Sequence, residues 1–271
     1  MERIKQAVER ARAERRRGPP INLTSFRVPD AGPSSQELEQ ITYTETRVVR
    51  VDPRHLEANR IVSTNKIDPR AMPFDMLRTK ILKTMSENGW RTIAVTSPRP
   101  GCGKTTVAIN LAVSIARQPD YTALVVDFDF RQPRVRSYLG LPRRNSLYDC
   151  IEGRCEVRDA LINPGISRLV VLANTNPVSH ASELLCSQRV KELVADLRQR
   201  YERRILIFDL PPVLTADDAI AFLPQVDCSL LVIASGASTK ADVDESQRLL
   251  VSGNLLGVVL NKADDYHISS Y

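Results

Sequence analysis

The fold of this chain is decided by one glycine-rich stretch, Ser97-Pro98-Arg99-Pro100-Gly101-Cys102-Gly103-Lys104-Thr105-Thr106. An apolar run from Ile93 to Val95 precedes it, and a helical pattern follows it. This order of strand, glycine loop, Lys-Thr and helix is typical of a phosphate-binding loop, although the strict pattern has glycine where Pro98 stands. Glycine backbone can wrap a phosphate with its N–H groups pointing inward, and the helix N-terminus adds positive charge. We therefore expect the loop to bind a nucleoside triphosphate.

The loop predicts a set of nucleotide contacts and one metal ligand. Lys104 can offset charge on the outer phosphates, and the Thr105 hydroxyl can ligate Mg²⁺. The expected contacts run through the whole loop: Pro100, Gly101, Cys102, Gly103, Lys104, Thr105 and Thr106. The histidines and cysteines are scattered and form no metal-binding spacing, so any metal should arrive with the nucleotide.

From about residue 71 onward, helical and apolar-strand patterns alternate. This alternation predicts an α/β fold with a doubly wound, mostly parallel sheet. Continuous apolar runs predict six strands: Thr92–Thr96, Ala123–Val126, Leu169–Leu172, Ile205–Phe208, Ser229–Ala234 and Gly257–Leu260. Apolar residues at helical spacing predict helices around 107–115 and 190–197.

We divide the chain of 271 residues into three parts. Residues 1–70 are expected to form a short basic helix and a flexible arm that is mostly disordered or loosely docked, because residues 18–70 are rich in proline, serine and scattered charge. Residues 71–265 should form the catalytic domain, and residues 266–271 a tail.

The chain carries a net charge of +6, with five arginines between residues 10 and 17. Such a cluster suits an anionic membrane surface, nucleic acid or an acidic partner, and a merely solvated tail is the plain alternative. No apolar run reaches the roughly 20 residues of a membrane-spanning helix, and the N-terminus lacks the apolar centre of a secretory signal. We therefore expect a cytoplasmic protein.

Three aspartates follow buried apolar runs, where ligands of open parallel sheets bind. Asp127 and Asp129 are two residues apart, so in extended chain both carboxylates lie on one side. Asp209 ends its run and is followed by Pro211-Pro212, as a Walker B acid would be. Alternatively, the three acids pair with Lys104 and Arg131 as buried ion pairs, but such pairs gain little stability once desolvation is included.

At this point the residues resemble a known family, the bacterial tyrosine kinases. The stretch 123–133, with Asp127-x-Asp129-x-Arg131, is similar to the family's own second Walker motif, and the glycine loop and Asp209-Leu210-Pro211-Pro212 match the other two. The resemblance extends from about Phe74 to Asp264. The basic arm is similar to that of the exosortase-associated exopolysaccharide autokinases.

The resemblance implies an enzyme that uses ATP and Mg²⁺ to phosphorylate its own C-terminal tyrosines, here Tyr266 and Tyr271. It also implies a role for each site residue. Lys104 and Thr105 would bind phosphates and Mg²⁺, and Asn261 would border the adenine. Asp127 would ligate Mg²⁺ and help as a base, Asp129 would orient or deprotonate the tyrosine hydroxyl, and Asp209 would complete the metal site. Arg131 would hold the acids or the transferring group.

The implied partners are a membrane-embedded chain-length determinant that activates the kinase, further copies of the chain, and a tyrosine phosphatase. Nucleic acid is not expected. The implied role is control of capsule or exopolysaccharide synthesis and export, with the protein held at the inner face of the membrane by its partner.

The sequence departs from the family pattern at three places. Only two tyrosines stand in the tail, and the ring-forming pattern Glu-x-x-Arg-x-x-Arg is reduced to Arg78, with Met72 and Asp75 at its other positions. Cys102 stands where glutamate is often found, which could make nucleotide binding sensitive to oxidation or be a tolerated neutral residue.

Three competing functions stay open. A positioning or partitioning ATPase shares the fold but has a signature lysine where Arg99 stands. A GTPase is suggested by Asn261-Lys262-Ala263-Asp264, which spells a guanine-reading motif. A scaffold that binds ATP without catalysis is favoured by the sparse tyrosines and the altered ring pattern.

Overall fold

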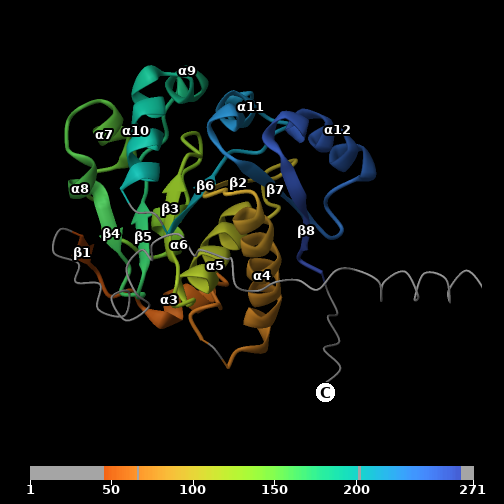
Figure 1. Ribbon diagram of the computed structural model, residues 1–271, viewed down its shortest axis with the longest axis horizontal. Coiled ribbons are helices and arrows are strands. Elements are labelled where there is room, and N and C mark those ends of the chain that lie inside the picture. Colours follow the sequence, from red (N-terminus) through yellow and green to blue (C-terminus); the bar gives the residue numbers. More distant parts are fainter. Residues whose placement is uncertain (1–45, 66, 201–202, 264–271) are drawn as a thin grey trace, which may run out of the picture. The chain divides into compact units, whose positions relative to one another are not determined.

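The computed structural model describes residues 46–65, 67–200 and 203–263 (Figure 1). The described strands form one eight-stranded sheet with the order β1-β4-β5-β3-β6-β2-β7-β8. All neighbouring strands are parallel except β4 and β5, which are antiparallel. The strands are β1 Arg47–Val48, β2 Thr92–Thr96, β3 Thr122–Asp127, β4 Leu161–Asn163, β5 Leu169–Leu172, β6 Arg204–Asp209, β7 Cys228–Ala234 and β8 Leu255–Asn261.

In the described part of the chain, helices lie between consecutive strands except between β4 and β5. The α-helices are α3 Pro53–Ala58, α4 Met72–Glu87, α5 Lys104–Ala116, α6 Val135–Tyr138, α7 Leu147–Ile151, α8 Val157–Ala160, α9 Ala181–Leu185, α10 Gln188–Gln199, α11 Asp218–Phe222 and α12 Lys240–Leu250. The short 3₁₀ helices of the described residues are η1 Pro69–Ala71, η2 Leu223–Gln225 and η3 Val251–Gly253.

Both faces of the sheet are covered, because successive side chains of a strand point to opposite faces. In β3, Ala123 and Val125 join the core formed with α4 and α5, whereas Leu124 and Val126 join the core formed with α9, α10 and α11. Figure 1 shows α4 and α5 side by side against the central strands. The predicted doubly wound α/β fold is confirmed.

All six predicted strands are present, each within one or two residues of its expected bounds. The sequence analysis assigned no strand to β1, where only residues 48–51 suggest an extended chain, or to β4; they have only two and three residues. A strand this short shows no usable periodicity, and β4 exists because it pairs with both β1 and β5.

Residues 46–65 and 67–70, the described part of the expected arm, are ordered and packed against the rest of the domain. Leu56 and Ile61 are buried here, and β1 joins the sheet. The Asn110 side chain on α5 accepts hydrogen bonds from the backbone N–H groups of Val62 and Ser63, both at 2.9 Å. This segment is ordered by a partner about fifty residues away, which local composition does not reveal. Residues 1–45, with the arginine cluster, lie outside the described residues.

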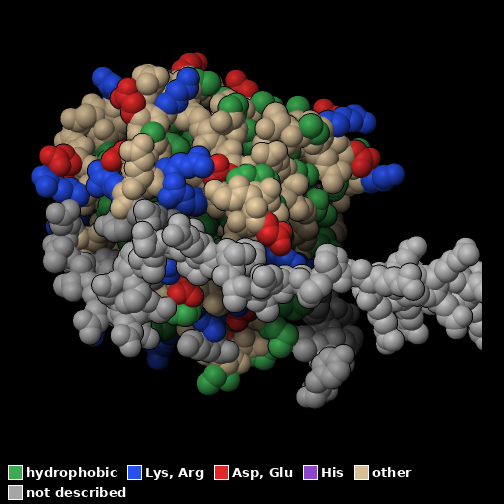
Figure 2. Space-filling view, viewed as in Figure 1, with side chains coloured by type: hydrophobic (Ala, Val, Ile, Leu, Met, Phe, Trp, Pro, Cys, Tyr) green, Lys and Arg blue, Asp and Glu red, His purple; other side chains and the backbone are tan. Residues whose placement is uncertain are grey.

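On the face drawn in Figure 2, Lys and Arg side chains are interspersed with Asp and Glu side chains. Among the helices of the described residues, none has the length and apolar character needed to cross a membrane.

Candidate active site

The strand order brings the three predicted acids to the phosphate-binding loop. Strand β6 lies between β3 and β2, and the loop follows β2 directly. Asp127 at the end of β3 and Asp209 at the end of β6 are opposite each other in the ladder. The carboxyl ends of these parallel strands therefore form one edge, which carries the loop and the acids together.

Lys104 is the charge centre of this edge. Its Nζ lies 2.8 Å from Asp129 Oδ2 and 3.5 Å from Asp209 Oδ1. The Thr105 hydroxyl donates a 2.6 Å hydrogen bond to Asp209 Oδ2. All of these residues are buried. Burial alone would lower the pKa of Lys104, but the carboxylates of Asp209, Asp129 and Asp127 raise it, so the ammonium form is held firmly.

Asp127 is fully buried and only partly satisfied. Its Oδ2 accepts a 3.1 Å hydrogen bond from the Val135 N–H, while Oδ1 has no hydrogen-bond partner among the described residues. Asp209 Oδ1 likewise accepts no hydrogen bond from the described part of the chain. Burial, followed by the neighbouring Asp209, raises the pKa of Asp127, and burial also raises the pKa of Asp209. Asp209 Oδ1 faces Lys104 Nζ only at 3.5 Å, and Asp127 Oδ1 has no hydrogen-bond donor among the described residues, so both buried oxygens are available to a cationic ligand.

These residues fit a magnesium ion that arrives with a nucleotide. Mg²⁺ is usually bound by one or two carboxylates together with substrate phosphates and water, rather than by a complete protein cage. Thr105, Asp127 and Asp209 supply such a partial set.

The glycines of the loop adopt a backbone conformation that other residues rarely take. Gly101 and Gly103 have φ values of 84° and 91°. A Cβ added to Gly103 would lie 2.2 Å from Nδ2 of Asn261, which donates a 2.9 Å hydrogen bond to the Cys102 carbonyl. The structure thus brings Asn261, the predicted adenine neighbour at the end of β8, against the loop.

Pro98 and Cys102, the unusual loop residues, are both accommodated. The carbonyl of Pro98 accepts a 3.2 Å hydrogen bond from the Leu214 N–H, which ties the loop to the segment after β6. Cys102 is buried, with its Sγ 3.6 Å from the Ser238 hydroxyl. Pro100 and Gly101 are exposed, while Thr106 is partly exposed.

Arg131 does not contact the three acids, which was one of its two expected roles. Its Nε and Nη2 lie 2.7 and 2.9 Å from the two carboxylate oxygens of Asp218, at the start of α11. Within the described residues, this carboxylate is its only ion-pair partner closer than 4.0 Å. The chain turns after Asp129, whose Oδ1 accepts a 2.9 Å hydrogen bond from the Gln132 N–H. Among the described residues, Lys104 is therefore the cation that pairs with these acids, and Arg131 pairs with Asp218.

Arg99, which stands where the positioning ATPases carry a signature lysine, is also held within the chain. Its Nε and Nη2 both lie 2.9 Å from Asp242 Oδ1, in the first turn of α12. In the expected ring motif, Arg78 lies 2.8 Å from Asp75 and 3.0 Å from the Ser114 hydroxyl on α5, so it joins two helices of the same chain.

Asn174 is a functional candidate that the sequence analysis missed. It is buried just beyond β5, and its Nδ2 donates a 2.8 Å hydrogen bond to the Asp127 carbonyl. Its Oδ1 accepts a 2.9 Å hydrogen bond from the Tyr148 N–H. Its place after the apolar run 169–173 is the same signal that singled out the aspartates.

Tyr266 and Tyr271, the expected phosphoacceptors, lie outside the described residues.

A glycine loop between strand and helix, facing acids at the ends of two neighbouring parallel strands, defines a P-loop nucleotide-binding protein. A family model described as an AAA domain matches residues 90–236. The tyrosine-protein kinase CpsD of Streptococcus pneumoniae is 32% identical over 183 residues, which cover 66% of this chain and 79% of CpsD. The chain therefore belongs to the bacterial tyrosine kinase family.

Solved structures agree with this assignment. The chimerical protein CapA2B2 superposes with a TM-score of 0.71 at 30% identity, covering 81% of this chain and 94% of the chimera. The cell division ATPase MinD of Pyrococcus furiosus is more distant, with a TM-score of 0.54 at 25% identity, covering 64% of this chain and 74% of MinD. The predicted kinase family and its relation to the positioning ATPases are both confirmed.

Proposed function

We propose that this chain is a protein-tyrosine kinase that uses Mg-ATP to phosphorylate tyrosines near the C-terminus of another copy of itself. The observation that carries the proposal is the position of Lys104 between Asp129 and Asp209, at 2.8 and 3.5 Å. Phosphoryl transfer requires mainly positioning and charge neutralisation, and these residues supply both.

Lys104 has two competing partners in this proposal. Without nucleotide it neutralises Asp129, at 2.8 Å. The outer phosphates of ATP would attract the same ammonium group, which would leave Asp129 free to accept the proton of a tyrosine hydroxyl. Nucleotide binding would thereby prepare the base.

Thr105, Asp127 and Asp209 would hold the magnesium ion. Bound Mg²⁺ would neutralise charge on the transferring phosphates. Asp127 Oδ1 and Asp209 Oδ1, which accept no hydrogen bond from the described residues, are the atoms available to ligate Mg²⁺, directly or through water. Asn261 would border the base of the nucleotide from the end of β8, and the loop backbone from Pro100 to Thr106 would bind its phosphates.

The deciding experiment is incubation of the purified chain with Mg-ATP, followed by mapping of phosphorylated residues by mass spectrometry. Phosphotyrosine at Tyr266 or Tyr271 is expected. Mixing an Asp129→Asn chain that keeps both tyrosines with an active Tyr266→Phe/Tyr271→Phe chain tests transfer between copies. Phosphate on the Asp129→Asn chain is expected, and its absence there, with autophosphorylation intact in the unaltered protein, contradicts transfer between copies.

The biological setting is part of the same proposal. We assign the kinase to control of capsule or exopolysaccharide synthesis and export, at the inner face of the membrane. The proposed partners are a membrane-embedded activator of the chain-length determinant type, further copies of the chain and a tyrosine phosphatase. Co-purification of the chain with a membrane protein encoded beside it would test the activator.

A positioning ATPase is the second candidate, favoured by the fold shared with MinD. Against it, Arg99 is bound to Asp242 of its own chain. ATP hydrolysis without phosphotyrosine would favour this alternative, and tighter binding of GTP than of ATP would favour the GTPase reading of Asn261.

A further inference from the structure

Two thiols outside the nucleotide site lie in contact. Cys150, in α7, and Cys155, just before α8, are five residues apart, and their Sγ atoms are 3.2 Å apart. Neither is bonded to the other, and both are partly exposed. The Cys150 thiol also lies 3.6 Å from the Glu156 carbonyl.

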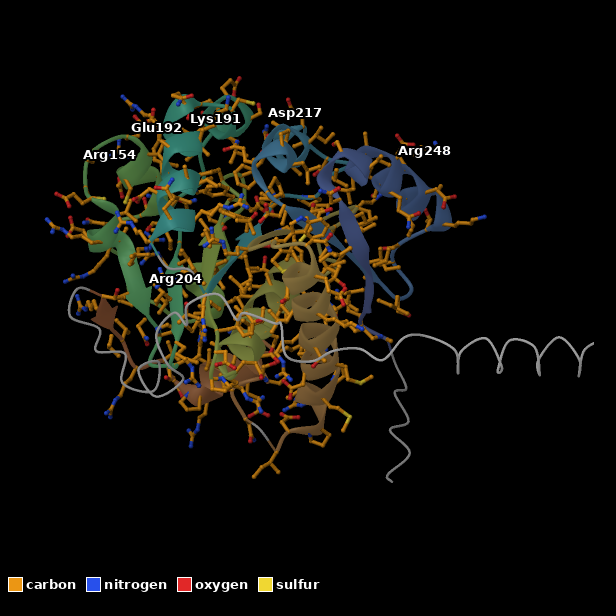
Figure 3. All side chains as sticks on the ribbon, viewed as in Figure 1. Arg154, Lys191, Glu192, Arg204, Asp217 and Arg248 are labelled. Atoms are coloured by element: carbon orange, nitrogen blue, oxygen red, sulfur yellow. The ribbon has the colours of Figure 1, made fainter. Side chains whose placement is uncertain are left out.

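The backbone between the two thiols is fixed in a tight turn. Gly153 has a φ of 74°, a conformation suited to glycine. The Gly153 N–H donates to the Cys150 carbonyl at 3.0 Å, and the Arg154 N–H donates to the Asp149 carbonyl at 2.8 Å. Figure 3 labels Arg154 beside α7. The turn therefore holds Cys155 against Cys150 in the folded chain.

Capping hydrogen bonds fix the two short helices that carry the pair. Ser146 and Asp149 exchange hydrogen bonds at the start of α7, and the Glu156 N–H donates a 3.3 Å hydrogen bond to the Asp159 carboxylate at the start of α8. Closing the gap to the S–S bond length of about 2.05 Å needs a movement of only about 1 Å. Side-chain rotation can supply most of it without unfolding either helix.

We propose that Cys150 and Cys155 form a redox modification site, which closes to an intramolecular disulfide in reaction with a low-molecular-weight disulfide such as oxidised glutathione. This inference does not rest on the proposed kinase activity. It goes against the expectation from spacing alone, because a C-x₄-C pair carries no sequence signal for a redox motif.

The chemistry balances in two exchange steps. The Cys155 sulfur, as thiolate, attacks one sulfur of oxidised glutathione, forms a mixed disulfide and releases one glutathione thiolate, which takes up the proton that Cys155 lost. The Cys150 sulfur then loses its proton to solvent, attacks Cys155 Sγ and releases the second glutathione, which is protonated in turn. Two protein thiols are oxidised, and one glutathione disulfide is reduced to two thiols. The first attack is assigned to Cys155 because the Cys150 thiol is engaged with the Glu156 carbonyl at 3.6 Å, and burial, followed by the contact with Cys155, raises the pKa of Cys150.

The other three cysteines provide internal comparisons. Cys102 and Cys228 are buried, and Cys186 is exposed. In the described part of the chain, none of the three has another cysteine sulfur within hydrogen-bonding distance. Cys186 can therefore take up glutathione but has no nearby thiol to resolve the mixed disulfide.

Trypsin offers a direct assay, because Arg154 lies between the two thiols. The full chain is incubated with oxidised glutathione, raised in concentration until Cys186 is glutathionylated, and is then alkylated and digested. Peptides 145–154 and 155–158 are expected to be joined by a disulfide that dithiothreitol releases. Cys155→Ser should abolish the joined pair, whereas Cys186→Ser should leave it unchanged.

A second arm of the experiment tests whether the native fold causes the preference for a disulfide between Cys150 and Cys155. The same reaction in urea should distribute glutathione over all five cysteines and lose the preference for the joined pair. The proposal is overturned if native protein carries glutathione on Cys186 while Cys150 and Cys155 are separately alkylated or carry stable glutathione. It is equally overturned if the joined pair forms as readily in urea as in the native protein.

Discussion

Asp127 and Asp209 are opposite each other at the ends of β3 and β6, both fully buried, and each has one carboxylate oxygen that accepts no hydrogen bond from the described residues. Lys104 lies 3.5 Å from Asp209 and 2.8 Å from Asp129, so its single positive charge serves more than one carboxylate. The site therefore places three carboxyl groups around one ammonium group, and a bound cation would compensate the carboxylates that Lys104 does not.

Asp127→Asn should stabilise the protein without nucleotide while weakening its response to magnesium. Burial of an incompletely compensated charge is unfavourable, and substitutions that stabilise a protein commonly raise the free energy of unfolding by about 0.5–2 kcal/mol, which is the gain expected here. In thermal unfolding, the variant should show a higher Tm than the unaltered chain in EDTA. It should also lose most of the additional Tm gain that Mg²⁺ gives over ATP alone.

The stability difference between Asp127→Asn and the unaltered chain should also depend on pH. The raised pKa of Asp127 means that the folded state binds its proton more tightly than the unfolded state. Its contribution to the free energy of unfolding therefore falls as pH rises from 3.8 through the higher folded pKa. The stability advantage of Asp127→Asn over the unaltered chain should grow with pH over this interval. An advantage that stays constant or shrinks would contradict the assigned burial of charge.

Asp129→Asn should abolish tyrosine phosphorylation while leaving the fold intact. Loss of one preorganised electrostatic contact typically costs about 10²–10³ in rate. The initial rate of phosphotyrosine formation measures the loss, and circular dichroism checks the fold. Lys104→Met is a poorer probe, because it leaves Asp129 and Asp209 without their counter-ion and should destabilise the protein by about 3–5 kcal/mol.

Gly103→Ala should destabilise the chain more than Gly101→Ala. Both glycines have positive φ, so alanine is strained by about 1–2 kcal/mol at either position. A Cβ at Gly103 would in addition lie 2.2 Å from Asn261 Nδ2, whereas a Cβ at Gly101 meets nothing within 4 Å. Urea unfolding of the protein without nucleotide measures the difference.

Asn261→Ala is the matching background for this pair. With the amide removed, the difference between Gly103→Ala and Gly101→Ala should disappear. If the difference persists in that background, the contact between the loop and Asn261 at the end of β8 is not the cause of the extra destabilisation by Gly103→Ala.

Asn174→Ala should lower both stability and activity, because it removes support from the Asp127 backbone. It leaves the Asp127 carbonyl and the Tyr148 N–H without their partner, and each unsatisfied buried group costs about 1–3 kcal/mol. Asn88→Ala is the control, since the Asn88 amide donates only to a carbonyl within its own exposed helix end. A fall in kcat beyond that of the control, at unchanged KM for ATP, would mark Asn174 as a positioning residue.

The sequence by itself determined the loop, the six main strands and the three aspartates, because these signals are local. A glycine cradle and a buried apolar run are written in consecutive residues, and an acid that ends such a run is read directly from its position. The parallel order of the strands then follows from alternation with helices.

Only the tertiary structure decided which side chains meet. Arg131 contacts Asp218 instead of the nearer acids, Asn174 supports Asp127, and Asn110 orders the segment around Val62. Each of these contacts joins residues more than forty positions apart, and the contact between Cys150 and Cys155 depends on the turn at Gly153. Pairings of this kind depend on the packing of helices and loops, so no local pattern of residue types encodes them.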